Sequence, residues 1–211
     1  MFIAFEGIEG SGKTSQLRRL AELLRAHGRT VVTTKEPGGT PLADRIRTIL
    51  LDTQSVIDPT AELFLFAASR RQHVTEVIGP ALERGEVVLC DRFTDSTLAY
   101  QGFGRRLPLD QLRTLNAWAT GQVQPASVII FDLAEEKGLA RARKRNASAI
   151  EDEGRFEAED LRFHRRVREG YLSLAAAEPQ RYAIVDADGT PDEVFARLVG
   201  LLGTRAPGLL A

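Results

Sequence analysis

The sequence contains a single cysteine, Cys90, which cannot form a disulfide within the chain. A lone thiol fits a reducing compartment, so we expect a cytoplasmic protein. Cys90 lies in an apolar run and is expected to be a small buried hydrophobic residue, not a nucleophile. The three histidines are scattered, and no group of Cys, His and Asp has the spacing of metal ligands. We therefore expect no zinc site.

Long apolar runs and an excess of either charge are also absent. No apolar run reaches the ~18 residues of a membrane-spanning helix, and the N-terminus does not have the composition of a secretion signal. The 28 basic and 29 acidic residues give a net charge of −1, which offers no general attraction to nucleic acid or to an anionic membrane. The 211 residues, 43% of them apolar, predict one domain over residues 1–211.

The most informative pattern is at residues 7–14, which have the spacing G-x-x-x-x-G-K-[ST] of a phosphate-binding loop. An apolar run precedes it, and an amphipathic helical pattern that stops at Gly28 follows it. A strand, a loop and a helix N-terminus in this order bind phosphates through backbone N–H groups. Lys13 should reach the β- and γ-phosphates, and Thr14 should bind Mg²⁺. The predicted phosphate-binding residues are Gly7, Ile8, Glu9, Gly10, Ser11, Gly12, Lys13 and Thr14.

Short apolar runs alternate with longer stretches of helical periodicity through the rest of the chain. This alternation predicts an α/β fold in which a doubly wound, five-stranded parallel sheet lies between two layers of helices. Ligands bind such sheets at the carboxyl ends of the strands. The predicted strands are Phe2–Phe5, Thr30–Thr34, Val87–Cys90, Val128–Phe131 and Tyr182–Val185. The polar residues that follow them are Glu6, Glu36, Asp91, Arg92, Asp132 and Asp186.

Some helix ends carry local signals. Pro108 and Gly121 bracket one helical segment. The last helix should begin at residues 190–193, where a capping box has proline at the first helical position. We expect residues 204–211 to form a frayed tail.

Two aspartates compete for the role of a Mg²⁺ ligand, because each ends an apolar strand. We favour Asp91 over Asp132. Arg92 follows Asp91 directly and would bring a cation next to the phosphates.

The segment 62–70 is helical and very apolar, and it carries a candidate site for a flat ring. Glu62, Phe66 and Arg70 follow one another at intervals of four residues, so they share one helix face. A phenyl ring can stack on a heterocycle while a guanidinium group binds its carbonyl edge.

Several arginines fall in segments that could face the ligand site. Phosphoryl transfer needs such cations, because charge spreads over the transferred group. The segment 141–155 has a basic start and then a polar stretch, a composition typical of a mobile loop. The candidate arginines are Arg47, Arg70, Arg92, Arg141, Arg143, Arg145 and Arg155.

No residue stands out as a general base for a hydroxyl acceptor. A phosphate monoester would need none, since its second pKa is near 6 and it is already largely ionised. Glu36, at a strand end, is the best alternative if a base is required.

Four segments together resemble bacterial thymidylate kinases. They read Phe-Glu-Gly-Ile-Glu-Gly-Ser-Gly-Lys-Thr, Lys-Glu-Pro-Gly-Gly-Thr, Leu-Phe-Ala-Ala-Ser-Arg-Arg and Leu-Cys-Asp-Arg-Phe-Thr-Asp-Ser-Thr-Leu-Ala-Tyr-Gln-Gly, and they begin at Phe5, Lys35, Leu65 and Leu89. The resemblance extends in order and spacing to about Tyr182. It implies a homodimeric nucleoside monophosphate kinase with a phosphate-binding-loop fold, which transfers the γ-phosphate of ATP to dTMP and uses Mg²⁺.

The resemblance also implies roles for individual residues. Glu9 would reach the sugar and phosphate of dTMP, Phe66 would stack on thymine, and Arg70 would bind its carbonyl edge. Tyr100 would crowd the 2′ position of the sugar. The remaining implied contacts are Arg47 and Arg92 to the acceptor phosphate, Gln101 to the base, Asp91 to Mg²⁺, and Thr97 at a position where serine is frequent. Phe93 stands where tyrosine is common in the family.

Members of this family take a catalytic cation either from the phosphate-binding loop or from a lid. The loop interior here, residues 8–11, carries no cation. The resemblance therefore implies the lid type, with a mobile lid at about residues 141–156. Arg141 and Arg145 are the catalytic candidates beside Lys13 and Arg92, and Arg155 is a weaker one.

Two other functions fit parts of the pattern. A deoxynucleoside kinase would use Glu36 as a base on a sugar hydroxyl. A nucleotide-dependent switch would use the same loop, but the sequence lacks the Asn-Lys-x-Asp motif that reads guanine in many switches.

Overall fold

The computed structural model describes residues 1–146 and 154–210, and the side chains of residues 145 and 146 lie outside this description. Its centre is a sheet of five parallel strands in the order β2-β3-β1-β4-β5. The register joins Phe2 to Val88 on one side of β1 and Ile3 to Ser127 on the other. The strands are β1 (Phe2–Glu6), β2 (Val31–Lys35), β3 (Val87–Asp91), β4 (Ser127–Asp132) and β5 (Tyr182–Asp186). All five predicted strands are confirmed, with ends shifted by one residue at most.

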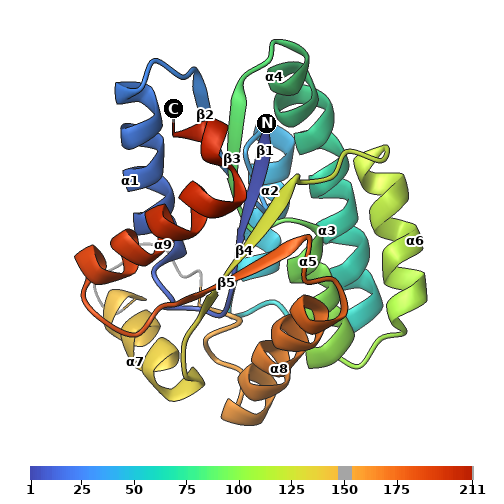
Figure 1. The fold of residues 1–211 in the computed structure, drawn as a ribbon. Coiled ribbons are helices and arrows are strands. Elements are labelled where there is room, and N and C mark those ends of the chain that lie inside the picture. The colour runs from blue at the N-terminus through green and yellow to red at the C-terminus, as the bar shows by residue number, and fades with distance from the viewer. Residues whose placement is uncertain (147–153, 211) are drawn as a thin grey trace.

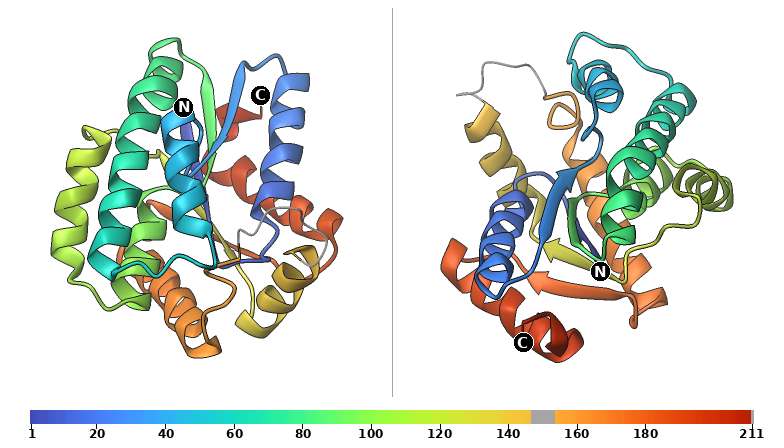
Figure 2. Two further views of the ribbon diagram at one scale, coloured as in Figure 1. Left: turned by 180° about the vertical axis from the view of Figure 1, so that it is seen from behind. Right: turned by 90° about the horizontal axis from the view of Figure 1, so that it is seen from above.

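Helices cover both faces of the sheet, so the three-layer prediction is confirmed (Figures 1 and 2). The helices are α1 (Lys13–Ala26), α2 (Pro41–Leu51), α3 (Pro59–His73), α4 (Gly79–Glu83), α5 (Thr94–Thr97), α6 (Leu109–Thr120), α7 (Glu135–Asn146), α8 (Leu161–Ala177) and α9 (Pro191–Arg205). Two π-helical turns, Val74–Ile78 and Leu98–Gly104, extend α3 and α5, and a 3₁₀ turn spans Pro207–Leu209.

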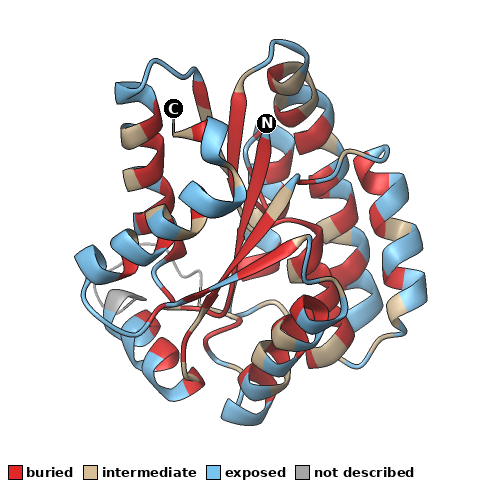
Figure 3. Cartoon of the chain, viewed as in Figure 1, coloured by how far each residue is buried: buried red, intermediate tan, exposed pale blue. Residues whose placement is uncertain are grey.

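Alternation along the central strand divides the core into two parts. Phe2 and Ala4 of β1 pack with the side chains of α3, α6 and α8, whereas Ile3 and Phe5 pack with those of α1 and α9. This follows from the two-residue period of a strand, which sends successive side chains to opposite faces. Figure 3 shows the result: the buried residues of the helices are turned toward the interior and the exposed ones face outward.

Two predicted helix ends are confirmed, and the predicted tail is wrong. Gly121 ends α6 with φ 57°, and Thr190 and Glu193 form a complete capping box at the start of α9. The residues after Thr204 do not fray over the described range. Arg205 completes α9, and Leu209 is buried against the α1/α9 side of the core. An apolar Leu209 near the chain end supplies the burial that a frayed tail would lack.

The phosphate-binding loop packs closely against the first turn of α7. Gly10 has φ 70°, and a Cβ atom there would lie 2.0 Å from the carbonyl oxygen of Gly138. A Cβ atom on Gly138 would lie 2.6 Å from the carbonyl oxygen of Glu9. Only a pair of glycines permits this approach, since both contacts are with backbone. Within the described residues, no helix is long and apolar enough to cross a membrane.

Gly138→Ala should therefore destabilise the protein and distort the loop. We expect the free energy of unfolding to fall by about 1–3 kcal/mol, the usual cost of overpacking, together with weaker ATP binding. Denaturant unfolding and calorimetry would measure both. Gly200→Ala is the matched control, because Gly200 lies in α9 with open space around it. Equal stability of the two variants would contradict the close packing.

Candidate active site

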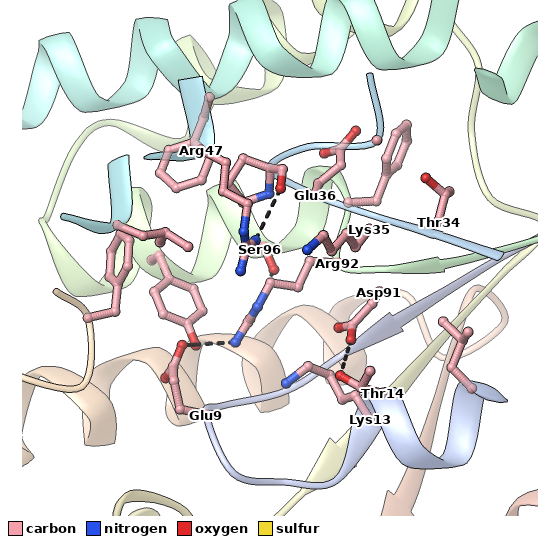
Figure 4. A pocket seen from close by; sticks show the side chains of 18 of the residues that line it. Glu9, Lys13, Thr14, Thr34, Lys35, Glu36, Arg47, Asp91, Arg92 and Ser96 are labelled. Atoms are coloured by element: carbon pink, nitrogen blue, oxygen red, sulfur yellow. Dashed lines mark hydrogen bonds and ion pairs between the residues drawn. The ribbon is translucent and has the colours of Figure 1, made fainter. Parts of the chain in front are cut away.

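A cleft of about 1700 Å³ opens at the carboxyl ends of β1, β2 and β3. The phosphate-binding loop lines one side, and residues of α2 and α3 line the other (Figure 4). This is the position at which parallel α/β sheets bind ligands. Most of the residues predicted for the site line this one cleft: Glu9, Gly10, Gly12, Lys13, Thr14, Arg47, Phe66, Arg70, Asp91, Arg92, Thr97, Tyr100, Gln101 and Arg141. Gly7, Ile8 and Ser11 belong to the same loop but do not line the cleft.

Lys13 is folded back into the loop it follows. Its Nζ donates hydrogen bonds to the carbonyl oxygens of Gly7 and Ile8, at 2.9 and 2.8 Å, and to the hydroxyl of Ser11. Burial and the nearby charge of Arg92 lower the pKa of Lys13 to about 8, although Asp91 and Glu9 partly offset them. The charged form of Lys13 is thus disfavoured in the free site, and the negative charge of a bound polyphosphate would favour it.

The two predicted Mg²⁺ ligands lie together at the end of β3. The hydroxyl of Thr14 donates a hydrogen bond to Oδ2 of Asp91 (Figure 4). Asp132, the competing aspartate, instead binds Arg168 through both oxygens, at 2.7 and 3.0 Å. The paired oxygens of Thr14 and Asp91 form a hard-ligand set that suits Mg²⁺.

Arg92 and Glu9 form an ion pair across the centre of the cleft. Nη2 of Arg92 lies 2.8 Å from Oε1 of Glu9, which also accepts a hydrogen bond of 2.6 Å from the hydroxyl of Tyr100. The guanidinium group lies 4.8 Å from the centre of the Tyr100 ring. Burial raises the pKa of Glu9, but Arg92 and His164 outweigh it and hold that pKa well below its usual range. The three side chains therefore form one fixed polar unit.

The residues predicted to bind a flat ring lie together on one face of α3. Phe66 and Arg70 line the cleft, and Glu62, on the same face of α3, is fully buried. The guanidinium of Arg70 donates to Glu36, Thr97, Asn116 and the carbonyl oxygen of Phe93. These four bonds fix its plane, and among the described contacts one of its five N–H groups is left for a ligand.

Comparison with known proteins agrees with this geometry. A protein-family model described as thymidylate kinase matches residues 5–198. The curated thymidylate kinase of Syntrophotalea carbinolica is 55% identical over 93% of this chain and 92% of its own length. That of Geobacter sulfurreducens is 54% identical over 98% of each chain. The chain belongs to the thymidylate kinase family. The expected activity, ATP-dependent phosphorylation of dTMP to dTDP, is confirmed by this relationship.

The fold of the chain is also that of a solved relative. The crystal structure of thymidylate kinase from Ehrlichia chaffeensis matches with a TM-score of 0.76 and 34% identity, over 96% of this chain and 98% of that one. The predicted fold class is therefore confirmed by a neighbour as well as by the sheet order.

Glu36, the candidate base of the alternative deoxynucleoside kinase, is engaged in structural contacts. One of its oxygens lies 2.7 Å from Nε of Arg70, and the other lies 3.1 Å from Nδ1 of His73. Nε2 of His73 is in turn 2.6 Å from the hydroxyl of Thr34. Glu36 therefore lines the cleft as a carboxylate that is paired with Arg70 and His73, and not as a free one.

Arginines of the predicted lid differ in position. Arg141 lines the cleft, and its Nη1 lies 3.4 Å from the carbonyl oxygen of Ala187. Arg145 lies in the last turn of α7, but its side chain, like residues 147–153 of the predicted lid, lies outside the described part of the chain. Arg155 binds the carbonyl oxygen of Leu50 and approaches Glu62 to 2.7 Å, so it is engaged beside α3.

Sequence reasoning assigned no role to Glu6, although it noted its place after a strand. This fully buried carboxylate accepts hydrogen bonds from the N–H groups of Phe93 and Ser96, at 2.7 and 3.2 Å, and from the hydroxyls of Ser96 and Tyr171. Burial and the charge of Asp95 raise its pKa to about 7. These bonds fix the backbone next to Arg92, which has the unfavourable φ of 71°.

Lys35 is a second residue without a predicted role. It is the last residue of β2, is exposed, and extends into the same part of the cleft as Arg47 and Arg92 (Figure 4). Its place in the Lys-Glu-Pro-Gly-Gly-Thr segment, at a strand end, was the available signal. Cys90, as predicted, is buried, and its Sγ lies 3.0 Å from the carbonyl oxygen of Arg92.

The lowered pKa of Lys13 predicts that ATP binding takes up a proton at alkaline pH. Above pH 8 the free enzyme is largely deprotonated at Lys13, whereas the triphosphate favours the ammonium form and raises the pKa in the complex. ATP affinity should therefore fall by up to about tenfold per pH unit above 8. Calorimetry at pH 8.5 in buffers of different ionisation enthalpy should detect the uptake.

Lys13→Arg provides the control, because a guanidinium group stays protonated throughout this pH range. Its ATP binding should show no such proton uptake. Identical uptake in both proteins would assign the titration to another group.

Proposed function

We propose that the cleft binds ATP at the phosphate-binding loop and dTMP opposite it, in contact with α3. One observation carries this proposal: a single cleft joins the loop with Lys13 to the ring pocket of Phe66 and Arg70, and Arg92 lies between them. Two nucleotides bound at these sites would meet with their phosphates near Arg92.

For the acceptor, we infer that Phe66 stacks on thymine, and that Arg70, Gln101 and Thr97 surround its polar edge. The fixed guanidinium plane of Arg70 supports this, because a bound base would find its donor already oriented. Tyr100 and Glu9, joined by a hydrogen bond, would contact the sugar, with the Tyr100 ring opposing a 2′ hydroxyl.

The acceptor phosphate would be held by Arg47 and Arg92, with Lys35 as a further cation beside them. One of its oxygens would attack the γ-phosphorus of ATP, and the bond from that phosphorus to the β–γ bridging oxygen would break, releasing ADP. No base is required, because the acceptor oxygen is already ionised near neutral pH. The involvement of Glu36 with Arg70 and His73 is consistent with this.

For ATP, we infer that the backbone of Gly7–Thr14 holds the phosphates and that Lys13 leaves its loop carbonyls to contact the β- and γ-phosphates. Thr14 and Asp91 would hold Mg²⁺, whose oxygen-ligand preference they satisfy. When bound, the ion would neutralise charge on the phosphate oxygens.

Over a single domain of residues 1–211, we propose that residues 141–156 act as the lid. Arg141, which lines the cleft, and Arg145, which follows it by about one helical turn, are the catalytic candidates for the transferred group. The close contact of α7 with the loop supports a lid whose root is fixed at the phosphates.

A coupled assay of ADP release, with ATP, Mg²⁺ and a panel of acceptors, tests this assignment. We expect dTMP to be strongly preferred over thymidine, because the cations of the cleft are arranged for an acceptor phosphate. Lys13→Ala should lower turnover by at least about a hundredfold, a usual loss for one charge-stabilising donor. Preference for thymidine would instead favour a deoxynucleoside kinase, and activity of Lys13→Ala within tenfold of wild type would remove Lys13 from catalysis.

We also propose a homodimer formed through α2, α3 and α6, which pack side by side. Half of the large apolar side chains exposed in the described residues lie on these three helices: Leu42, Ile49, Phe64 and Trp118. Trp118 is 78% exposed and Phe64 is 59% exposed, and exposed aromatic residues of this size are typical of interfaces.

Trp118→Glu should disrupt this dimer by placing a charge at its apolar surface. Light scattering on a sizing column should give twice 23.2 kDa for the wild type and 23.2 kDa for the variant. Ile184→Glu is the control, since Ile184 is an exposed apolar residue on β5, away from the three helices. A monomeric wild type, or a dimeric Trp118→Glu, would overturn the proposed interface.

A further inference from the structure

Glu62 is a fully buried carboxylate that the proposed mechanism does not use. It lies in the first turn of α3, one turn before Phe66 and two turns before Arg70. Its Oε1 accepts a hydrogen bond of 2.8 Å from Nε2 of Gln101, a residue that is 1% exposed and lines the cleft. Glu62 itself does not line the cleft, so it reaches the ligand site only through its neighbours.

The chemistry of this pair fixes which way the Gln101 amide faces. A side-chain amide has a donor side and an acceptor side, whereas a carboxylate can only accept. Nε2 must therefore face Glu62, and Oε1 lies on the opposite side of the group. A flipped amide would bring two acceptor oxygens together inside a buried site, which is strongly unfavourable.

Two guanidinium groups balance the charge of Glu62 and keep it in place. Nη2 of Arg155 lies 2.7 Å from its Oε2, and Nη2 of Arg105 lies 3.3 Å from the same oxygen. Arg105 has a second carboxylate partner, Glu159, at 2.5 Å from its Nη1. Nε of Arg105 also lies 3.4 Å from Oε1 of Glu62, so Gln101 shares this oxygen with Arg105 but makes the shorter contact with it, at 2.8 Å.

We propose that Glu62 is a positioning residue that selects thymine over cytosine by orienting the Gln101 amide. This inference rests on the proposed binding of the base by Phe66, Arg70 and Gln101. The edge of thymine or uracil presents an N3–H donor beside a carbonyl oxygen. Oε1 of Gln101 matches the donor, and the guanidinium of Arg70 matches the carbonyl group.

Cytosine presents the inverse pattern, an unprotonated N3 beside an amino group. Its N3 would face Oε1 of Gln101, and its amino group would face Arg70, so acceptor would meet acceptor and donor would meet donor. The Gln101 amide could relieve the first conflict only by flipping, which Glu62 prevents. Without an acceptor-only partner, the amide is free to adopt either orientation.

Glu62→Gln tests the inference, because it keeps the shape of the side chain and adds a donor. Dissociation constants for dTMP, dUMP and dCMP would be measured by calorimetry, with turnover measured for dTMP. We expect the dTMP/dCMP affinity ratio to fall at least about tenfold, with dUMP following dTMP and kcat changing much less than KM. An unchanged ratio in a folded Glu62→Gln protein overturns the proposal.

A double-mutant cycle separates positioning through Gln101 from other routes. In a Gln101→Ala background, Glu62→Gln should leave the dTMP/dCMP ratio unchanged; an equal loss there overturns the proposal. Glu159→Gln is the matched control, because it removes the other carboxylate of Arg105 and leaves the Glu62–Gln101 bond intact. It should retain wild-type selectivity, and a loss as large as that of Glu62→Gln would assign the effect to Arg105.

If Glu62→Gln does not fold, Glu62→Asp serves in its place. The shorter side chain keeps the charge for both arginines but withdraws from Gln101, so selectivity should still fall, and its retention would overturn the proposal. Failure of the proposed site is distinguishable: a wild type that does not prefer dTMP over dCMP contradicts the base pocket itself. A selective wild type with an equally selective Glu62 variant contradicts only the role of Glu62.

Discussion

The buried carboxylate of Glu6 holds together the elements that build the cleft. It ends β1, and its four hydrogen bonds bind the backbone after β3, the first turn of α5 and the hydroxyl of Tyr171 on α8. Arg92 stands immediately before these bonds, in a backbone conformation that a non-glycine residue rarely adopts. The position of the central cation therefore depends on a residue that does not itself line the cleft. Buried polar groups that are fully satisfied give this kind of rigidity.

The charges of the cleft form a series of balanced pairs around that centre. Glu9 pairs with Arg92, Asp91 accepts a hydrogen bond from Thr14, and Glu36 holds Arg70. Glu62, which does not line the cleft, pairs with Arg155 and Arg105 beside it. Each carboxylate keeps a cation or donor in a defined orientation before a ligand arrives. Preorganisation of this kind lowers the cost of arranging donors around a polyanion.

The sequence predicted the parts of this arrangement that depend on local patterns. The strands, the phosphate-binding loop and the shared face of Glu62, Phe66 and Arg70 follow from periodicity and from the chemistry of short motifs. Pairings between distant residues could not be predicted in this way. The pairing of Asp132 with Arg168, 36 residues away, is one example, and it supports the prediction that favours Asp91 over Asp132 as the Mg²⁺ ligand. The engagement of Glu36 by His73, and the burial of Leu209, likewise depend on tertiary packing.

The single thiol of the chain has a practical consequence. Cys90 is fully buried in β3, and burial together with the charge of Glu36 raises its pKa well above the usual value. Alkylating reagents act on exposed thiolates, so they should not react with Cys90 in the native protein. A cysteine introduced on the exposed side of α7 would then be the sole point of attachment for a fluorophore or spin label. The chain is thus ready for site-directed spectroscopy without first replacing its own cysteine.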